Sequence, residues 1–105
     1  MRKWFVRDQE GREIYLTEEQ WHHIASRHSE LRGHVDDVLN TVRHGRRQQQ
    51  PQDPQAYVYC LPCNTLHPPF NGILVVVVFR FERQELNGMI PNNFIVTAWG
   101  IMMRR

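Results

Sequence analysis

The sequence predicts an α+β domain in which an N-terminal hairpin and two helices pack on a curved antiparallel sheet of about four strands. Apolar residues at helical spacing occupy the first half of the chain, and the apolar period changes to two after residue 45. A nearly unbroken apolar run at 73–81 indicates a central strand buried on both faces. Two helices on one face of a sheet are the simplest packing for this order of elements.

A chain of 105 residues is long enough for one hydrophobic core, and no repeat or linker divides it. We expect a single domain over 1–105, with the hairpin in 1–16, the helices in 17–45 and the sheet in 46–101. The composition, 41% hydrophobic and 23% charged, excludes wholesale disorder. Neither a membrane-spanning run nor a signal-peptide core is present, so we expect a soluble cytoplasmic protein.

The first helix is predicted by its N-terminal capping residues. Apolar segments at 4–6 and 14–16 flank a polar stretch and predict the hairpin. Thr17 follows as the N-cap, and Gln20 completes a capping box three residues later. An apolar stripe then carries the helix to about residue 28.

The second helix is predicted by five apolar residues at helical spacing, namely Leu31, Val35, Val38, Leu39 and Val42. Gly45 is its natural stop. The sequence that follows predicts strands at 48–50, 57–61, 73–81 and 94–101. Prolines keep the segments around 61–72 and 84–93 out of the sheet, as long loops.

Charge is distributed unevenly along the chain. Residues 1–40 hold six Lys/Arg against eight Asp/Glu, whereas residues 41–105 hold seven against three. Four of the six histidines lie between residues 22 and 34. The net charge of +2 does not by itself indicate a nucleic-acid-binding protein. An acidic-to-basic gradient with clustered histidines would suit a phosphate-bearing substrate, although most such charges solvate a surface.

The densest group of polar side chains lies at the end of the first helix. His23 and Arg27 are four residues apart on one helix face, and Glu30 follows one turn later. His28 lies where the apolar stripe meets this face, at the helix C-terminus, where the helix dipole stabilises an imidazolium. The alternative is a boundary histidine that hydrogen-bonds a carbonyl, beside a solvated Arg27.

The sheet half contributes further candidates. Arg80 ends the central strand, where it either pairs with a carboxylate or points into a cleft. Thr97 and Trp99 share one face of the last strand, where they could position a phosphate and stack on a base, or could simply pack. Arg46 and Arg47 belong to the only local basic cluster and could follow a phosphate backbone, or solvate a helix end.

Cys60, Cys63 and His67 resemble three of the four ligands of a structural zinc site. The remaining candidates for a fourth ligand are distant histidines. The cysteine pair does not precede a helix, where thiolates are usually activated. We therefore expect two unreactive cysteines, no metal and no cofactor.

Several short motifs carry a resemblance to a known family. In the first half they are Leu16-Thr17, Trp21, His23-Ile24, Arg27-His28 and Glu30-Leu31. This string resembles small phage- and bacteria-encoded domains of the barnase–EndoU–colicin–RelE-like nuclease superfamily, in which N-terminal helices lie on a four-stranded antiparallel sheet. Thr97-Ala98-Trp99 is similar to the motif of the family's last strand, and the resemblance covers about 13–101. Ser29 stands where the family usually has proline, and the loops at 60–72 and 84–93 are longer than the family needs.

The resemblance implies a metal-independent, toxin-like endoribonuclease, with RNA as its substrate and a cognate antitoxin protein as a partner. Cleavage through the 2′-hydroxyl needs groups that transfer protons and cations that stabilise the phosphorane. The residues expected to be catalytic are His28, His23, Arg27, Arg80 and Thr97. Those expected to bind substrate are Arg46, Arg47, Trp99 and Glu30. An enzyme requires the catalytic set on one surface; the alternative is a non-catalytic nucleic-acid- or protein-binding module of the same fold.

Overall fold

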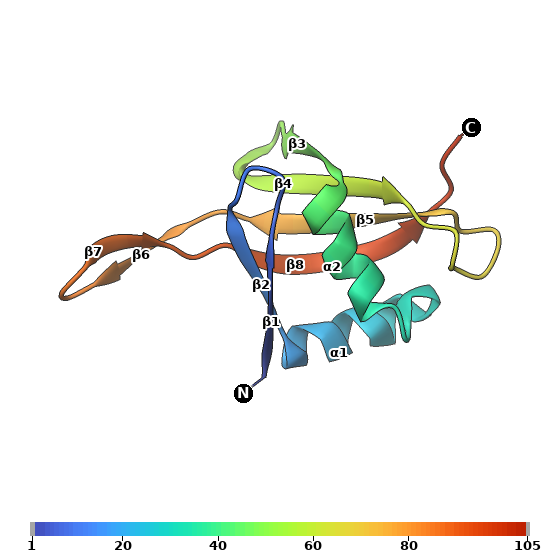
Figure 1. Cartoon of the computed structure of the whole chain (residues 1–105), viewed down its shortest axis with the longest axis horizontal. Helices are drawn as coiled ribbons and strands as arrows, with labels where there is room; N and C mark the ends of the chain where they lie inside the picture. Colours follow the sequence, from blue (N-terminus) through green and yellow to red (C-terminus); the bar gives the residue numbers. More distant parts are fainter. Residues whose placement is uncertain (1, 105) are drawn as a thin grey trace.

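Six strands form one mixed sheet in the computed structural model, which describes residues 2–104, so the two ends of the predicted domain 1–105 lie outside it. The strand order is β1-β2-β8-β5-β4-β3; the helix α2 lies across one side of the sheet, and the helix α1 lies along the edge of β8 (Figure 1). In chain order the elements of this body are β1 (Lys3–Arg7), β2 (Glu13–Thr17), α1 (Glu18–Arg27), the 3₁₀ turn η1 (Ser29–Leu31), α2 (Val35–His44), β3 (Arg46–Gln50), β4 (Asp53–Pro62), β5 (Gly72–Val78) and β8 (Phe94–Ile101).

The predicted sheet of about four antiparallel strands is wrong, although the protein does combine helices with a sheet. The N-terminal hairpin belongs to the sheet, because β2 pairs in parallel with β8 at Tyr15 and Phe94. The Asn93 carbonyl accepts the Tyr15 N–H, and the Asn93 amide donates to the Glu13 carbonyl. These contacts join residues about 80 positions apart, and no local pattern in the sequence indicates them.

A second correction concerns the segment 84–93, which was expected to be a loop. It forms most of a two-stranded ribbon, β6 (Phe81–Gln84) and β7 (Gly88–Pro91), which projects from the body of the molecule (Figure 1). Gly88 provides the positive φ of its turn, at 67°. The predicted central strand at 73–81 therefore ends at Val78, and its last residue, Phe81, begins the ribbon.

The helices begin and end close to the predicted residues. The Thr17 hydroxyl accepts the Gln20 N–H at 3.0 Å, which confirms the N-cap of α1. Leu31, expected in the second helix, instead lies in the 3₁₀ turn, and α2 begins at Val35. Gly45 ends α2 in an extended conformation, and a Cβ there would lie 2.2 Å from the Thr41 carbonyl oxygen. Lack of space, rather than backbone freedom, therefore requires glycine at this position.

The core lies between the helices and the inner side of the curled sheet. Burial alternates along β5, where Ile73, Val75 and Val77 are fully buried, whereas Leu74 and Val76 are only partly buried. We call the side of the sheet opposite α2 the outer face. Strand pairing then places on the outer face Arg46, Val58, Cys60, Leu74, Val76, Thr97 and Trp99.

A buried hydrogen-bond cluster holds the β1–β2 turn against β4. The Tyr59 hydroxyl donates to Asp8 Oδ2 at 2.6 Å, and the Arg12 guanidinium donates to the same oxygen at 3.0 Å. Burial alone would raise the pKa of Asp8, but these bonds and two backbone N–H donors outweigh it and lower that pKa. Burial, together with the Asp8 charge, raises the pKa of Tyr59 well above its ordinary value. The hairpin is therefore anchored by a carboxylate that is charged at neutral pH.

Removal of the Tyr59 hydroxyl should destabilise the protein. In Tyr59→Phe the buried Asp8 carboxylate loses a donor, so we expect a loss of about 1.5–3 kcal/mol in the free energy of unfolding, measured by urea denaturation. Tyr57→Phe is the matched control, because the Tyr57 hydroxyl forms no hydrogen bond within residues 2–104. Equal losses in the two variants would contradict the anchoring role.

The Asp8 cluster also predicts a pH dependence. Because the pKa of Asp8 is lower in the folded than in the unfolded state, its charged form stabilises the protein above about pH 4, and this stabilisation is lost as pH falls through the folded-state pKa. The difference in unfolding free energy between wild type and Asp8→Asn should therefore be constant near neutral pH and shrink below about pH 4. A difference that grows on acidification would refute this account. Urea titrations across this range measure it.

Candidate functional site

The site is organised by the free edge of β8, against which α1 and η1 pack. Within residues 2–104, β8 pairs with β2 only at Phe94, and its C-terminal half has no strand neighbour on this side. The Gln20 side-chain amide donates to the Val96 carbonyl, and Glu30 Oε2 accepts the Gly100 N–H at 2.8 Å. These two side chains satisfy edge groups that another strand would otherwise bind.

His28 lies at the end of α1, where the chain leaves the helix. Its N–H donates to the Ile24 carbonyl at 2.8 Å, and its φ of −124° ends the helical conformation. The imidazole centroid lies 6.1 Å from that of Trp99, and Nδ1 lies 3.9 Å from Glu30 Oε2. Nε2 forms no hydrogen bond within the described part of the chain. The ring is thus held between an indole and a carboxylate, with 32% of its side chain exposed.

Thr97 and Trp99 share the outer face with this histidine. Strand pairing sets Thr97 opposite Val76 and Trp99 opposite Leu74. Side chains two residues apart on a strand point to the same side, about 7 Å apart. Neither points into the core, which confirms the expectation that the two side chains share one face. The structure therefore brings together His28, Glu30 and Trp99, and Thr97 projects from the same face as Trp99.

Arg80 lies at the other end of β8. Its guanidinium carbon lies 5.7 Å from the centroid of Phe94, five residues before Trp99. At about 3.3 Å per residue, this separates Arg80 from the His28 end by roughly 16 Å. Arg80 is on the outer face, but it is too far away to stabilise a phosphate at His28.

His23 and Arg27 are both exposed on α1, four residues apart on one side of the helix. Neither side chain forms a hydrogen bond or ion pair within residues 2–104. Arg27 immediately precedes His28, whereas His23 lies five positions before it. Trp21, another motif residue, packs against the core and so has a structural role.

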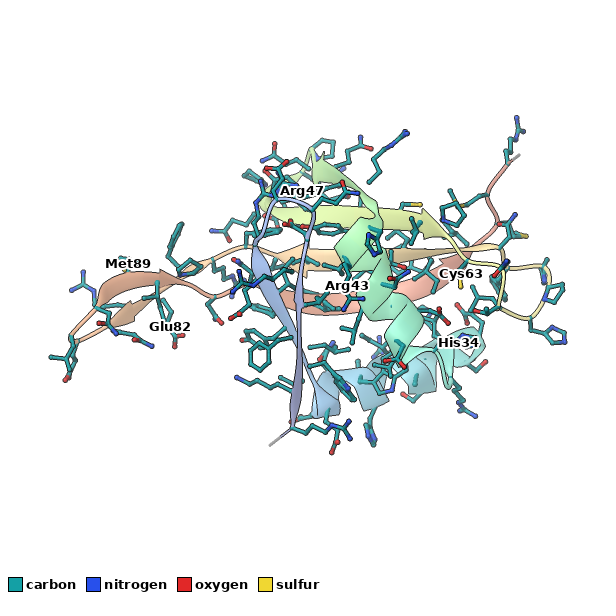
Figure 2. All side chains as sticks on the ribbon, viewed as in Figure 1. His34, Arg43, Arg47, Cys63, Glu82 and Met89 are labelled. Carbon is teal, nitrogen blue, oxygen red and sulfur yellow. The ribbon has the colours of Figure 1, made fainter. Side chains whose placement is uncertain are left out.

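The two arginines of β3 point to opposite sides of the sheet. Arg46 pairs with Cys60 on the outer face. Arg47 lies on the other side, its guanidinium carbon 4.0 Å from the Tyr57 centroid and 5.6 Å from that of Phe79. Figure 2 shows Arg47 near β3, away from the end of α1. Of these two arginines, both predicted to bind substrate, only Arg46 shares a face with Thr97 and Trp99.

The cysteines do not come together with His67 as metal ligands. Burial raises the pKa of the Cys60 thiol, and the charge of Arg46 offsets this only in part. Cys63 Sγ contacts the Thr65 hydroxyl at 3.2 Å, and His67 Nδ1 contacts the Pro68 carbonyl at 2.9 Å. Across residues 2–104, no three His, Cys, Asp or Glu side chains are grouped as a metal would require.

Comparisons with family models, curated proteins and solved structures give no match for this chain. The resemblance to the nuclease superfamily therefore stays a prediction. None of the helices in the described range 2–104 is both long and apolar enough to cross a membrane.

Sequence reasoning missed two features of this region. The capping pattern accounts for the Gln20 N–H, but it does not indicate that the Gln20 side-chain amide reaches β8. Phe5, Tyr15 and Phe94 were treated only as strand residues, yet their rings lie next to one another. Alternation along β1 and β2 was the available signal, since Phe5 and Tyr15 alternate with the buried Val6 and Leu16.

Loss of the Glu30 carboxylate should expose its structural role. Glu30→Ala leaves the Gly100 N–H without its partner, and we expect it to lower the free energy of unfolding by about 1–3 kcal/mol, measured by thermal and urea denaturation. Glu30→Gln keeps an acceptor oxygen and should retain most of the stability. If both variants are as stable as wild type, Glu30 does not hold the edge of β8.

Proposed function

We propose that this protein is a metal-independent endoribonuclease that cleaves RNA at the outer face beside the end of α1. The observation that carries the proposal is the environment of His28. Its ring lies against Trp99, Glu30 faces Nδ1, and Thr97 projects from the same face of β8. A histidine whose Nδ1 faces a carboxylate at 3.9 Å, and whose Nε2 has no hydrogen-bond partner within residues 2–104, is suited to proton transfer.

Cleavage proceeds by attack of the ribose 2′-oxygen on the adjacent phosphorus. His28 Nε2 accepts the 2′-hydroxyl proton as the new phosphorus–oxygen bond forms. The phosphorus–5′-oxygen bond then breaks, and the 5′-oxygen takes a proton, leaving a 2′,3′-cyclic phosphate and a 5′-hydroxyl. We assign the donated proton to His23, the other exposed histidine of the motif. Arg27 supplies positive charge to the phosphorane, and Thr97 donates a hydrogen bond to a phosphate oxygen.

Trp99 completes the site as a stacking surface for the base next to the cleaved bond. An indole presents a large flat face, and stacking tolerates any base. Arg46 shares the outer face and lies in the same cross-strand row as Trp99, but three strands away, at roughly 14 Å; it would contact a more distant part of the RNA. Arg80 and Arg47 have no role at this site, because Arg80 lies about 16 Å along β8 and Arg47 lies on the opposite side of the sheet.

A non-catalytic nucleic-acid-binding module is the second candidate function. It is favoured by the exposed position of His23, which no contact holds beside His28 in residues 2–104. In that case the outer face would bind RNA without turnover. A toxin role and a cognate antitoxin remain predictions that follow from the nuclease proposal.

RNA cleavage in EDTA separates the two functions. We expect wild type to release products that carry a 2′,3′-cyclic phosphate, and His28→Ala to be about 10²- to 10⁴-fold slower, because acid–base catalysis contributes rates of this order. His22→Ala is the matched control, an exposed histidine of α1 outside the motif. His23→Ala tests the proton donor.

Three outcomes would reject parts of the proposal. Equal cleavage by wild type and His28→Ala would reject His28. Complete sensitivity of the wild-type activity to EDTA would reject the metal-independent mechanism. Binding of RNA without cleavage in any buffer would leave the non-catalytic module as the function.

A further inference from the structure

Three aromatic side chains form a continuous ladder where β2 meets β8. The ring centroids of Phe5 and Tyr15 are 6.3 Å apart, and those of Tyr15 and Phe94 are 5.9 Å apart. We call these three residues the aromatic ladder. The Tyr15 hydroxyl donates to Asn92 Oδ1 at 2.8 Å, which fixes the middle ring. Phe5 is 58% exposed, although a phenylalanine gains free energy when it is buried.

Two cations lie directly on this ladder. Lys3 Nζ lies 4.4 Å from the Tyr15 centroid, and the guanidinium carbon of Arg80 lies 5.7 Å from that of Phe94. Neither forms an ion pair with an acidic side chain within residues 2–104. The surface thus combines flat apolar rings with two positive charges that form no ion pair in the described part of the chain.

A hollow adjoins the ladder between β2 and the start of β8. Its volume is about 190 Å³, and its lining consists of Tyr15, Thr17, Gln20, Phe94, Ile95 and Val96. An apolar cavity of about 150 Å³ accommodates a benzene ring. The hollow therefore has room for a planar ring, and two of its walls are ladder rings.

We propose that the aromatic ladder binds unpaired bases of a single-stranded nucleic acid, with Lys3 and Arg80 contacting the flanking phosphates. Aromatic side chains interleaved with cations are the recognised means of binding single strands, and each stacked base contributes about 1–3 kcal/mol. A duplex buries its base faces in its own stack, so the ladder selects single strands. The two cations on the rings complement a polyanion and make the surface a poor match for an apolar protein partner.

The ladder and His28 lie at opposite ends of β8, about 16 Å apart. A stacked single strand advances about 3.4 Å per phosphate, so about five nucleotides cover this distance, and an extended strand needs fewer. The idea that the ladder positions a substrate for His28 rests on the proposed nuclease function. The idea that the ladder binds a single strand does not depend on that function. The ladder would hold one part of the strand while His28 acts on another.

Binding is measured with a fluorescein-labelled 2′-O-methyl oligoribonucleotide, which has no free 2′-hydroxyl and cannot be cleaved by the proposed route. Because Phe5→Ala removes the ring on which one base stacks, we expect it to raise the Kd roughly 5- to 150-fold, measured by fluorescence anisotropy. Phe5→Trp keeps a ring and should restore binding. Arg80→Gln should raise the Kd and reduce the slope of log K against log salt by about 0.7.

Each control variant makes the same type of substitution at a residue outside the aromatic ladder. Phe81→Ala removes a phenylalanine that is 68% exposed on the projecting ribbon. Arg43→Gln removes a cation from α2, which lies on the other side of the sheet (Figure 2). Both controls should bind as wild type does. Because Phe5 and Phe81 are both exposed, we expect neither alanine variant to change the melting temperature.

The outcomes separate the ladder from the nuclease. If wild type binds the single strand through Phe5 and Arg80 but cleaves no RNA, the ladder is supported and the proposed function fails. If wild type cleaves RNA while Phe5→Ala and Arg80→Gln bind as wild type does, the ladder proposal is overturned and the nuclease stands. Equal affinity for a duplex of the same sequence would also overturn it. Retained binding by His28→Ala supports two separate sites.

Discussion

The free edge of β8 is the constraint on which the rest of this structure depends. In the described part of the chain one residue pair joins β2 to β8, so no strand binds the backbone groups of β8 beyond Phe94. Backbone groups that become buried without a neighbouring strand need other hydrogen-bond partners. Gln20 and Glu30 provide them at Val96 and Gly100, and α1 and η1 are thereby held along the strand. The position of His28 beside Trp99 follows from this requirement, because His28 lies between the two capping residues.

The two ends of β8 then differ in chemistry although they share one face. At Trp99 a histidine and a carboxylate meet an indole, which suits proton transfer beside a stacked base. At Phe94 the neighbours are aromatic rings and Arg80, which forms no ion pair within residues 2–104, and such a surface suits binding alone. Glu30 contributes to both stability and chemistry, since one oxygen accepts the Gly100 N–H and also faces the His28 ring.

Features governed by neighbouring residues could be predicted from the sequence. Thr17 caps α1 because an N-cap needs only a hydroxyl and an N–H three residues later, and the last strand coincides with its predicted range, 94–101. The number of strands and the parallel pair could not be predicted, because they depend on contacts between residues far apart in the chain. The same limit applies to Arg80, which was assigned to the His28 site but lies on Phe94.

The sequence by itself determined most of the helices and strands and the residue types available at the site. Periodicity and capping are local properties, and they placed both helices, the N-terminal hairpin, and the shared face of Thr97 and Trp99. Tertiary structure alone decided which side chains meet. The turn of the hairpin is held by Asp8 and Tyr59, 51 residues apart, and this packing sets the aromatic ladder on the outer face. Such contacts depend on how the strands pair and curl, a property of the whole chain that no segment encodes.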